Sequence, residues 1–147
     1  MRLIGYIYNF REWPSALQVH VETCLSQAIP SDPVVVQVRL SYSVALFWYD
    51  HKKQSKTEIE GALRLALNLQ MHNEEFAGKN GADDPVVRES WRRIWWMLYT
   101  IDAYYAGTLG TMEFQAMEVD ATVGLPCEEQ EYESGVRCHT LLLSRFQ

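Results

Sequence analysis

The sequence predicts an all-α fold, a multi-helix bundle-like fragment with a central aromatic helix and an extended acidic C-terminal segment. Three features carry this prediction: prolines at helix starts, apolar side chains at helical spacing, and a cluster of tryptophans. Trp91, Trp95 and Trp96 fall within six positions. Because aromatic side chains of this size dominate the energetics of a core, we expect the helix that bears them to be central.

Two helices are expected in the first third of the chain. Trp13-Pro14-Ser15 and Asp32-Pro33 each place a proline where a helix would begin, and the missing N–H of proline costs nothing in a first helical turn. Apolar residues then recur at helical spacing in both segments. The run Val34-Val35-Val36 alone would favour a strand, but the helical period continues beyond it.

A third helix is expected in the middle of the chain. Ser55-Lys56-Thr57-Glu58 is a capping-box pattern, and the periodic segment that it opens runs to about Asn73. A polar loop with two glycines is expected at residues 78–81. These features separate the third helix from the aromatic one.

The aromatic helix should begin at Asp84-Pro85 and continue to about Ala106, with Gly107 as its C-terminal residue. Beyond it, residues 113–135 are rich in acids and lose the helical period, so they predict an extended or loop segment.

Composition narrows the class of protein. At 147 residues the chain has the length of about one domain, and 48% hydrophobic with 22% charged residues is typical of a globular protein. The net charge of −6 and the lack of a lysine and arginine cluster argue against a broad phosphate-binding surface. The longest aliphatic and aromatic stretch, residues 44–49, is far shorter than a membrane span.

Cysteine usage predicts free thiols in a reducing compartment. Cys24, Cys127 and Cys138 are odd in number and far apart, which fits free thiols better than a disulfide framework. No Cys-x-x-Cys pair occurs, so a cysteine zinc site is not expected. We expect a soluble intracellular protein without a metal or other cofactor.

Two helical stretches resemble the middle homology (regulatory) region of fungal binuclear zinc-cluster transcription factors, and the later segment from Asp120 to Pro126 looks like the stretch where that family places its aspartate and leucine-proline. The better match is the arginine-tryptophan helix, through Arg92, Arg93, Trp95, Trp96 and Asp102. The other is the alanine- and leucine-rich stretch at residues 62–73, which is similar to a family helix that ends in a glycine-leucine-histidine-arginine-like motif. Here a glutamine, at position 70, replaces the glycine.

The resemblance implies a domain assignment and a function. Residues 1–135 resemble the family's regulatory region, whereas residues 136–147 form an unmatched tail. The implied function is regulation of transcription in the nucleus, by a fragment or truncated form of a zinc-cluster factor that acts through intramolecular or partner contacts. Zinc and DNA binding are expected only in the family's separate DNA-binding module. Self-association is also expected, because the predicted helices cover the aromatic helix incompletely.

The candidate structural or regulatory residues are those of the best-matching helix: Arg92, Arg93, Trp95, Trp96 and Asp102. Asp102 shares a stripe with Trp95, so it should be buried and paired, with Arg39 or Arg64 or with backbone donors. We expect one of the two adjacent arginines to pair with a carboxylate and the other to stack on a tryptophan.

Two other functions remain open at this point. A small helical metal-dependent enzyme could use Asp83, Asp84 and Asp102, although Asp83-Asp84 is better suited to capping the aromatic helix. A helical interaction module left by gene truncation is the other alternative. The resemblance implies no catalysis, so an enzyme is not the preferred interpretation.

Overall fold

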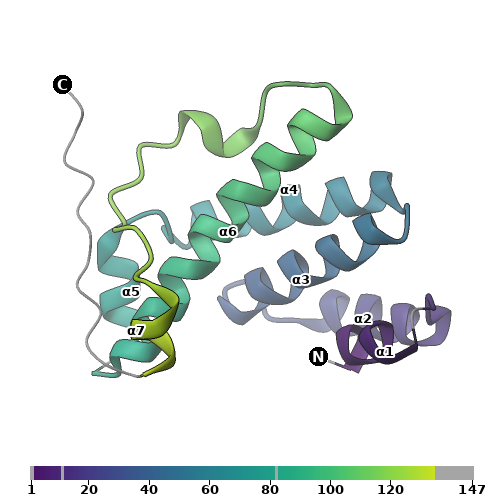
Figure 1. Ribbon diagram of the computed structural model, residues 1–147, viewed down its shortest axis with the longest axis horizontal. Coiled ribbons are helices and arrows are strands. Elements are labelled where there is room, and N and C mark those ends of the chain that lie inside the picture. The colour runs from purple at the N-terminus through teal and green to yellow at the C-terminus, as the bar shows by residue number, and fades with distance from the viewer. Residues whose placement is uncertain (1, 11, 82, 135–147) are drawn as a thin grey trace. The chain divides into compact units, whose positions relative to one another are not determined.

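The computed structural model describes residues 2–10, 12–81 and 83–134, and its regular elements over these residues are seven α-helices and one 3-10 helix (Figure 1). The predicted all-α class is confirmed. The chain divides into two compact units, Met1–Leu65 and Ala66–Gln147, and the boundary falls within one helix. In the described ranges no helix is both long and apolar enough to cross a membrane.

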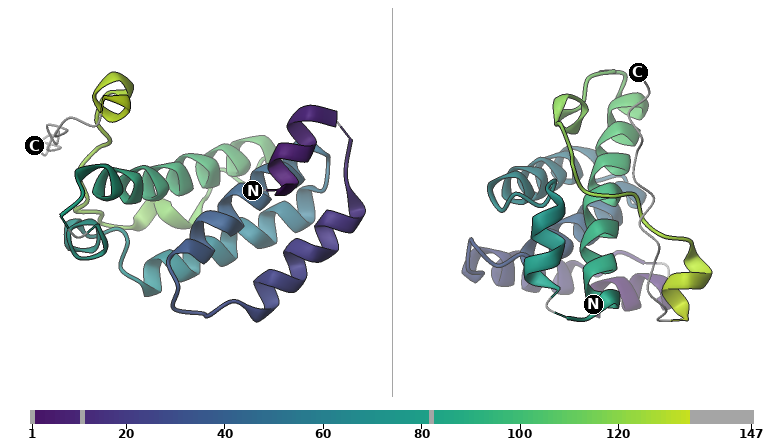
Figure 2. Two further views of the ribbon diagram at one scale, coloured as in Figure 1. Left: turned by 90° about the horizontal axis from the view of Figure 1, so that it is seen from below. Right: turned by 90° about the vertical axis from the view of Figure 1, so that its left-hand side faces the viewer.

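The first unit contains α1 (Arg2–Phe10), α2 (Ser15–Gln27), α3 (Val34–Trp48) and most of α4 (Lys52–Asn68). Two of these helices begin directly after Pro14 and Pro33, as the sequence predicts. Leu3 of α1 and two residues of α3 form a buried cluster, against which α2 packs its apolar side chains. Figure 2 shows the backbones of these helices from two further directions. The valine run of α3 is helical because Val35 and Val36 are buried, and burial outweighs the strand propensity.

The start of α4 differs from the capping-box prediction. The helix begins at Lys52, and Ser55 lies inside it as a fully buried residue. Its Oγ donates to the carbonyl oxygen of Ser43 at 2.8 Å, while the Ser43 Oγ donates to the carbonyl oxygen of Ser55 at 2.9 Å. Ser55 therefore joins α4 to α3 and does not cap a helix. Asp50, with a φ of 64°, makes the turn before α4.

The second unit contains the end of α4, then α5 (Glu74–Asn80), α6 (Pro85–Leu109), the 3-10 helix η1 (Gln115–Glu118) and α7 (Glu129–Glu133). The predicted loop at residues 78–81 is mostly the end of α5. This short helix forms because Phe76 and Ala77 are buried and the ring of Phe76 meets Trp91 of α6 edge-on, 5.7 Å between centroids.

The predicted aromatic helix is α6, and the residues that cap its two ends determine where it begins and ends. Asp84 caps the N-terminus by accepting from the N–H groups of Val86 and Val87, at 2.8 and 3.4 Å. The helix ends three residues later than predicted, because Gly110 takes the left-handed conformation with a φ of 73°. That conformation suits glycine, which has no Cβ to clash, whereas Gly107 stays helical.

Candidate functional site

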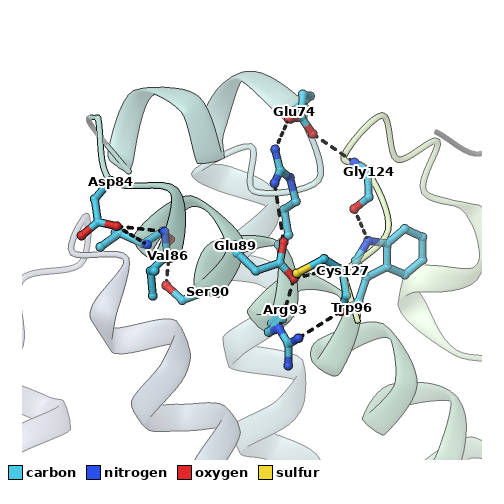
Figure 3. A network of polar contacts seen from close by, with 11 residues as sticks. Glu74, Asp84, Val86, Glu89, Ser90, Arg93, Trp96, Gly124 and Cys127 are labelled. Atoms are coloured by element: carbon cyan, nitrogen blue, oxygen red, sulfur yellow. Dashed lines mark hydrogen bonds and ion pairs between the residues drawn. The ribbon is translucent and has the colours of Figure 1, made fainter. Parts of the chain in front are cut away.

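Glu89 is the centre of a polar network on α6 (Figure 3). It is 1% exposed, and its Oε1 accepts from Nε of Arg93 at 3.1 Å and from the backbone N–H of Cys127 at 2.9 Å. Its Oε2 lies 3.5 Å from Nη1 of Arg92. Residues three and four apart are neighbours on a helix, so α6 itself brings both arginines to this carboxylate. A buried carboxylate needs such partners to offset its desolvation.

Arg92 extends the network to α5. Its Nη2 donates to Oε1 of Glu74 at 2.7 Å, and Oε2 of Glu74 accepts from the N–H of Gly124 at 3.0 Å. Partial burial works to raise the pKa of the Glu74 carboxyl, but the hydrogen bonds from Arg92 and Gly124 outweigh it and hold that pKa below its ordinary value. The hydrogen bond to Glu74 in turn raises the pKa of Arg92.

Arg93 extends the network towards α7. Its Nη1 donates to Glu129 at 2.5 Å and its Nη2 to the carbonyl oxygen of Cys127 at 3.0 Å. The guanidinium also lies over the ring of Tyr132, 4.1 Å from the centroid. Both adjacent arginines thus pair with carboxylates, and Arg93 in addition stacks on a tyrosine where the sequence suggested a tryptophan.

Neutral hydrogen bonds also join the backbone around Gly124 to other parts of the second unit. The indole Nε1 of Trp96 donates to the carbonyl oxygen of Gly124 at 2.8 Å. The carbonyl oxygen of His72 accepts from the N–H groups of Thr122 and Val123, each at 3.0 Å.

We call residues Thr122–Cys127 the docked segment, and the four charged residues that hold it the carboxylate clamp: Glu74, Glu89, Arg92 and Arg93. The docked segment has no regular helix, so its backbone groups cannot pair within it as those of a helix do. The clamp supplies two of the missing acceptors, at Gly124 and Cys127. The clamp therefore joins α5, α6 and the docked segment, and its arginines and glutamates pair with one another.

Asp102 and Trp95 lie further into the second unit. Asp102 is 7% exposed, and its Oδ2 accepts from the N–H of Ala116 in η1 at 3.0 Å. The expected contact with a backbone donor is therefore present. Trp95 is fully buried, with its ring 5.7 Å from that of His72. Arg39, suggested as a partner of Asp102, donates to Glu58 at 2.6 Å in the first unit.

The acids invoked for a metal enzyme have other partners. Asp84 caps α6, and the exposed Asp83 lies 3.7 Å from Arg88. Over the described residues, no group of three or more histidine, cysteine, aspartate or glutamate residues is placed to hold a metal ion.

The cysteines divide between the two units. Cys24 is an exposed free thiol on α2, as the sequence predicts. Cys127 is disulfide-bonded, so the free-thiol prediction is wrong for this residue. The prediction for Cys138 lies outside the described residues.

Sequence reasoning missed the acidic half of the clamp. Glu89 stands three and four positions before Arg92 and Arg93, a spacing that favours ion pairs on a helix and that could have identified it. Nothing local marks Glu74, because its partners lie 18 and 50 positions further along the chain.

Comparison with known proteins assigns the class. The family model described as the fungal specific transcription factor domain matches residues 12–144, which include the whole clamp and the docked segment. The chain belongs to this family and is a regulatory domain of the fungal transcription factor type.

A curated relative gives a more particular likeness. The chain is 33% identical over 149 residues to the C6 finger domain transcription factor iacK of Pestalotiopsis fici, an alignment that covers 99% of this chain. It spans 22% of that protein's length. No solved structure matches the chain.

Proposed function

We propose that this domain regulates a nuclear transcription factor through contacts with other parts of that factor or with partner proteins. The observation that carries the proposal is the carboxylate clamp. It uses Arg92 and Arg93, from the stretch of α6 that resembles the family, to fix the docked segment on α5 and α6. Trp96 of the same stretch donates a hydrogen bond to that segment directly. The motif residues thus set the shape of the second unit. Arg92, Arg93, Trp95, Trp96 and Asp102 are proposed as structural residues on which regulation depends.

In this proposal the domain neither binds duplex DNA nor holds zinc. The second unit carries thirteen acidic against six basic residues, and phosphate binding requires clustered basic side chains. Zinc and DNA contacts are assigned to a separate module, such as the C6 finger in the name of the Pestalotiopsis relative. About one tightly held zinc ion per purified chain, measured by metal analysis, would overturn this part.

Exposed apolar residues support contacts with partners or with a second copy. Met97 and Tyr104, seven residues apart on α6, are 51% and 57% exposed, and Met112 is 76% exposed. Methionine and tyrosine are enriched in protein interfaces. Sedimentation of the purified chain should show association that rises with concentration, and a monodisperse monomer would count against self-association.

A reporter experiment tests regulation directly. The chain is placed between a heterologous DNA-binding domain and an activation domain, and reporter output is compared with that of a fusion that lacks the chain. We expect the chain to change the output and Arg93→Gln to abolish the change. Lys79→Gln, which removes an exposed charge from α5, is the matched control and should behave as wild type. Equal output with and without the chain, at equal protein levels, would refute the proposal.

A further inference from the structure

A cavity of about 190 Å³ lies in the first unit, between α1, α2 and α3. Leu3 and Ile4 of α1, Val21 of α2 and Val38 of α3 form part of its apolar wall. Leu3 is buried, whereas Ile4 and Val38 are 38% and 40% exposed. The cavity can therefore be reached from solvent. The clamp lies in the other unit and takes no part in it.

The chemistry of the wall is neutral. None of the lining residues carries a charge, and the polar ones are Gln37, Ser41 and Tyr42. The hydroxyl of Tyr42 is engaged, since it donates to Glu22 at 2.9 Å and accepts from Gln54 at 3.2 Å. Over the described residues, the side chains of Gln37 and Ser41 make no hydrogen bond. These two groups are therefore available to a ligand, and a charged ligand would lose its hydration without gaining a partner charge.

The volume limits the size of the ligand. A dry apolar cavity of about 150 Å³ is known to hold benzene, and pockets for drug-sized ligands begin at roughly 300 Å³. A cavity of 190 Å³ lies between these values. It fits a compound slightly larger than benzene.

We propose that this cavity binds a small neutral amphipathic molecule, with a short aliphatic or aromatic body and one hydroxyl, amide or carbonyl group. The body would contact Leu3, Ile4, Val21 and Val38, and the polar group would bond to Ser41 or Gln37. Such a ligand touches all three helices, so its binding stabilises the packing of α1 on α2 and α3. Binding in this cavity is a property of the first unit and does not depend on the proposed function.

Binding is tested with two neutral probes, indole and 1-hexanol, on the full chain. Saturation-transfer NMR reports contact, and thermal unfolding reports stabilisation. Hexanoate and hexylamine are the charged controls, matched to 1-hexanol in chain length. We expect saturable binding of at least one neutral probe, with a midpoint of unfolding that rises with its concentration, and no effect from the charged compounds. Absence of saturable binding for both neutral probes, or equal binding of the charged ones, would overturn the proposal.

Matched variants locate the site. Val38→Trp should fill the cavity and weaken binding by about tenfold or more. Val19→Trp makes the same change at a position of α2 that is 62% exposed and outside the cavity lining, and binding should stay unchanged. Val34→Phe, at a lining residue 49% exposed, provides a second blocking variant if Val38→Trp fails to fold. Equal affinity in blocked and control variants would show that the probes bind elsewhere and refute the assignment.

Discussion

Within each of the two units of this domain, polar side chains hold a different kind of chain segment in place. The first unit, Met1–Leu65, has seven basic and six acidic residues, whereas the second, Ala66–Gln147, has six basic and thirteen acidic. In the first unit, reciprocal hydroxyl–backbone hydrogen bonds between Ser43 and Ser55 join one helix to another. In the second, the carboxylates of Glu74 and Glu89 hold the docked segment.

This difference follows from what has to be held. Helices satisfy their own backbone groups, so the side-chain contacts of the first unit only have to align α3 with α4, through the Ser43–Ser55 hydrogen bonds and the Arg39–Glu58 ion pair. The docked segment is not helical, so its N–H and C=O groups find their partners on other segments of the second unit. Hydrogen bonds to ionised groups are roughly twice as strong as neutral ones. The second unit should therefore respond to loss of charge more strongly than the first.

The largest expected effect is that of Glu89→Ala. Removing this buried carboxylate strands Arg92 and Arg93 and leaves the N–H of Cys127 without its acceptor. Breaking a buried ion pair costs about 3–5 kcal/mol, and we expect a loss of that order in the free energy of unfolding, measured with denaturant. Glu75→Ala, at an exposed residue of α5, is the control. A loss no larger than that of the control would mean that the clamp does not stabilise the unit.

Asp102→Ala should have the next largest effect. It removes the buried acceptor of the Ala116 N–H, and hydrogen bonds to charged groups contribute about 1.5–3 kcal/mol. Thermal unfolding should show a lower midpoint, with a smaller change for Asp102→Asn, which keeps an acceptor. An unchanged midpoint would contradict the structural role of this acid and favour an exposed functional one.

High pH should destabilise the first unit in particular, because Tyr42 lies in it. Burial, followed by the hydrogen bond to Glu22, raises the pKa of the Tyr42 hydroxyl well above its usual range. Because the folded pKa is the higher one, the stabilisation is present below the unfolded pKa of about 10 and is lost as the pH rises towards the folded pKa. Denaturant unfolding at pH 8 and pH 11 should show a larger loss for wild type than for Tyr42→Phe. Equal losses would contradict this assignment.

The smallest expected effect is a gain of stability in Gln70→Gly. Gln70 has a φ of 60° just after α4, and a left-handed conformation costs a residue with a Cβ roughly 1–2 kcal/mol. The greater freedom of glycine in the unfolded chain offsets part of this, so the net gain should be up to about 1 kcal/mol. Denaturant unfolding should show no gain for Gln70→Ala. In the family helix that residues 62–73 resemble, a glycine stands at the position of Gln70, which agrees with this backbone geometry.

Local signals predicted much of the fold. Pro14, Pro33 and Asp84 marked the starts of α2, α3 and α6, because capping and first-turn chemistry depend on residues that are adjacent in the sequence. The start of α4 was mistaken because the capping-box pattern contains Ser55, whose actual partner is Ser43 on another helix. The short helix α5 was missed because its stability comes from packing on α6, which no local pattern records.

The candidate site was predictable only in part. The resemblance indicated Arg92, Arg93 and Trp96, and the helical spacing of Glu89 was visible in the sequence. Their common target was not, because Gly124 lies 28 positions after Trp96 and 50 after Glu74. A hydrogen bond to a backbone group leaves no trace in residue identity. The docked segment therefore became evident only from the three-dimensional structure.

The most direct test that charged side chains hold the docked segment is an acid titration in which NMR monitors the amide resonance of Gly124. Because the pKa of Glu74 is lowered in the folded state, its contribution is present above the ordinary carboxyl value of about 4.3 and is lost as the pH falls through the folded pKa. The Gly124 resonance should shift with a midpoint below that value, and Glu74→Gln should abolish the shift while the Ser43 and Ser55 amides of the first unit stay in place. A Gly124 resonance with the same pH response in wild type and variant would contradict the account.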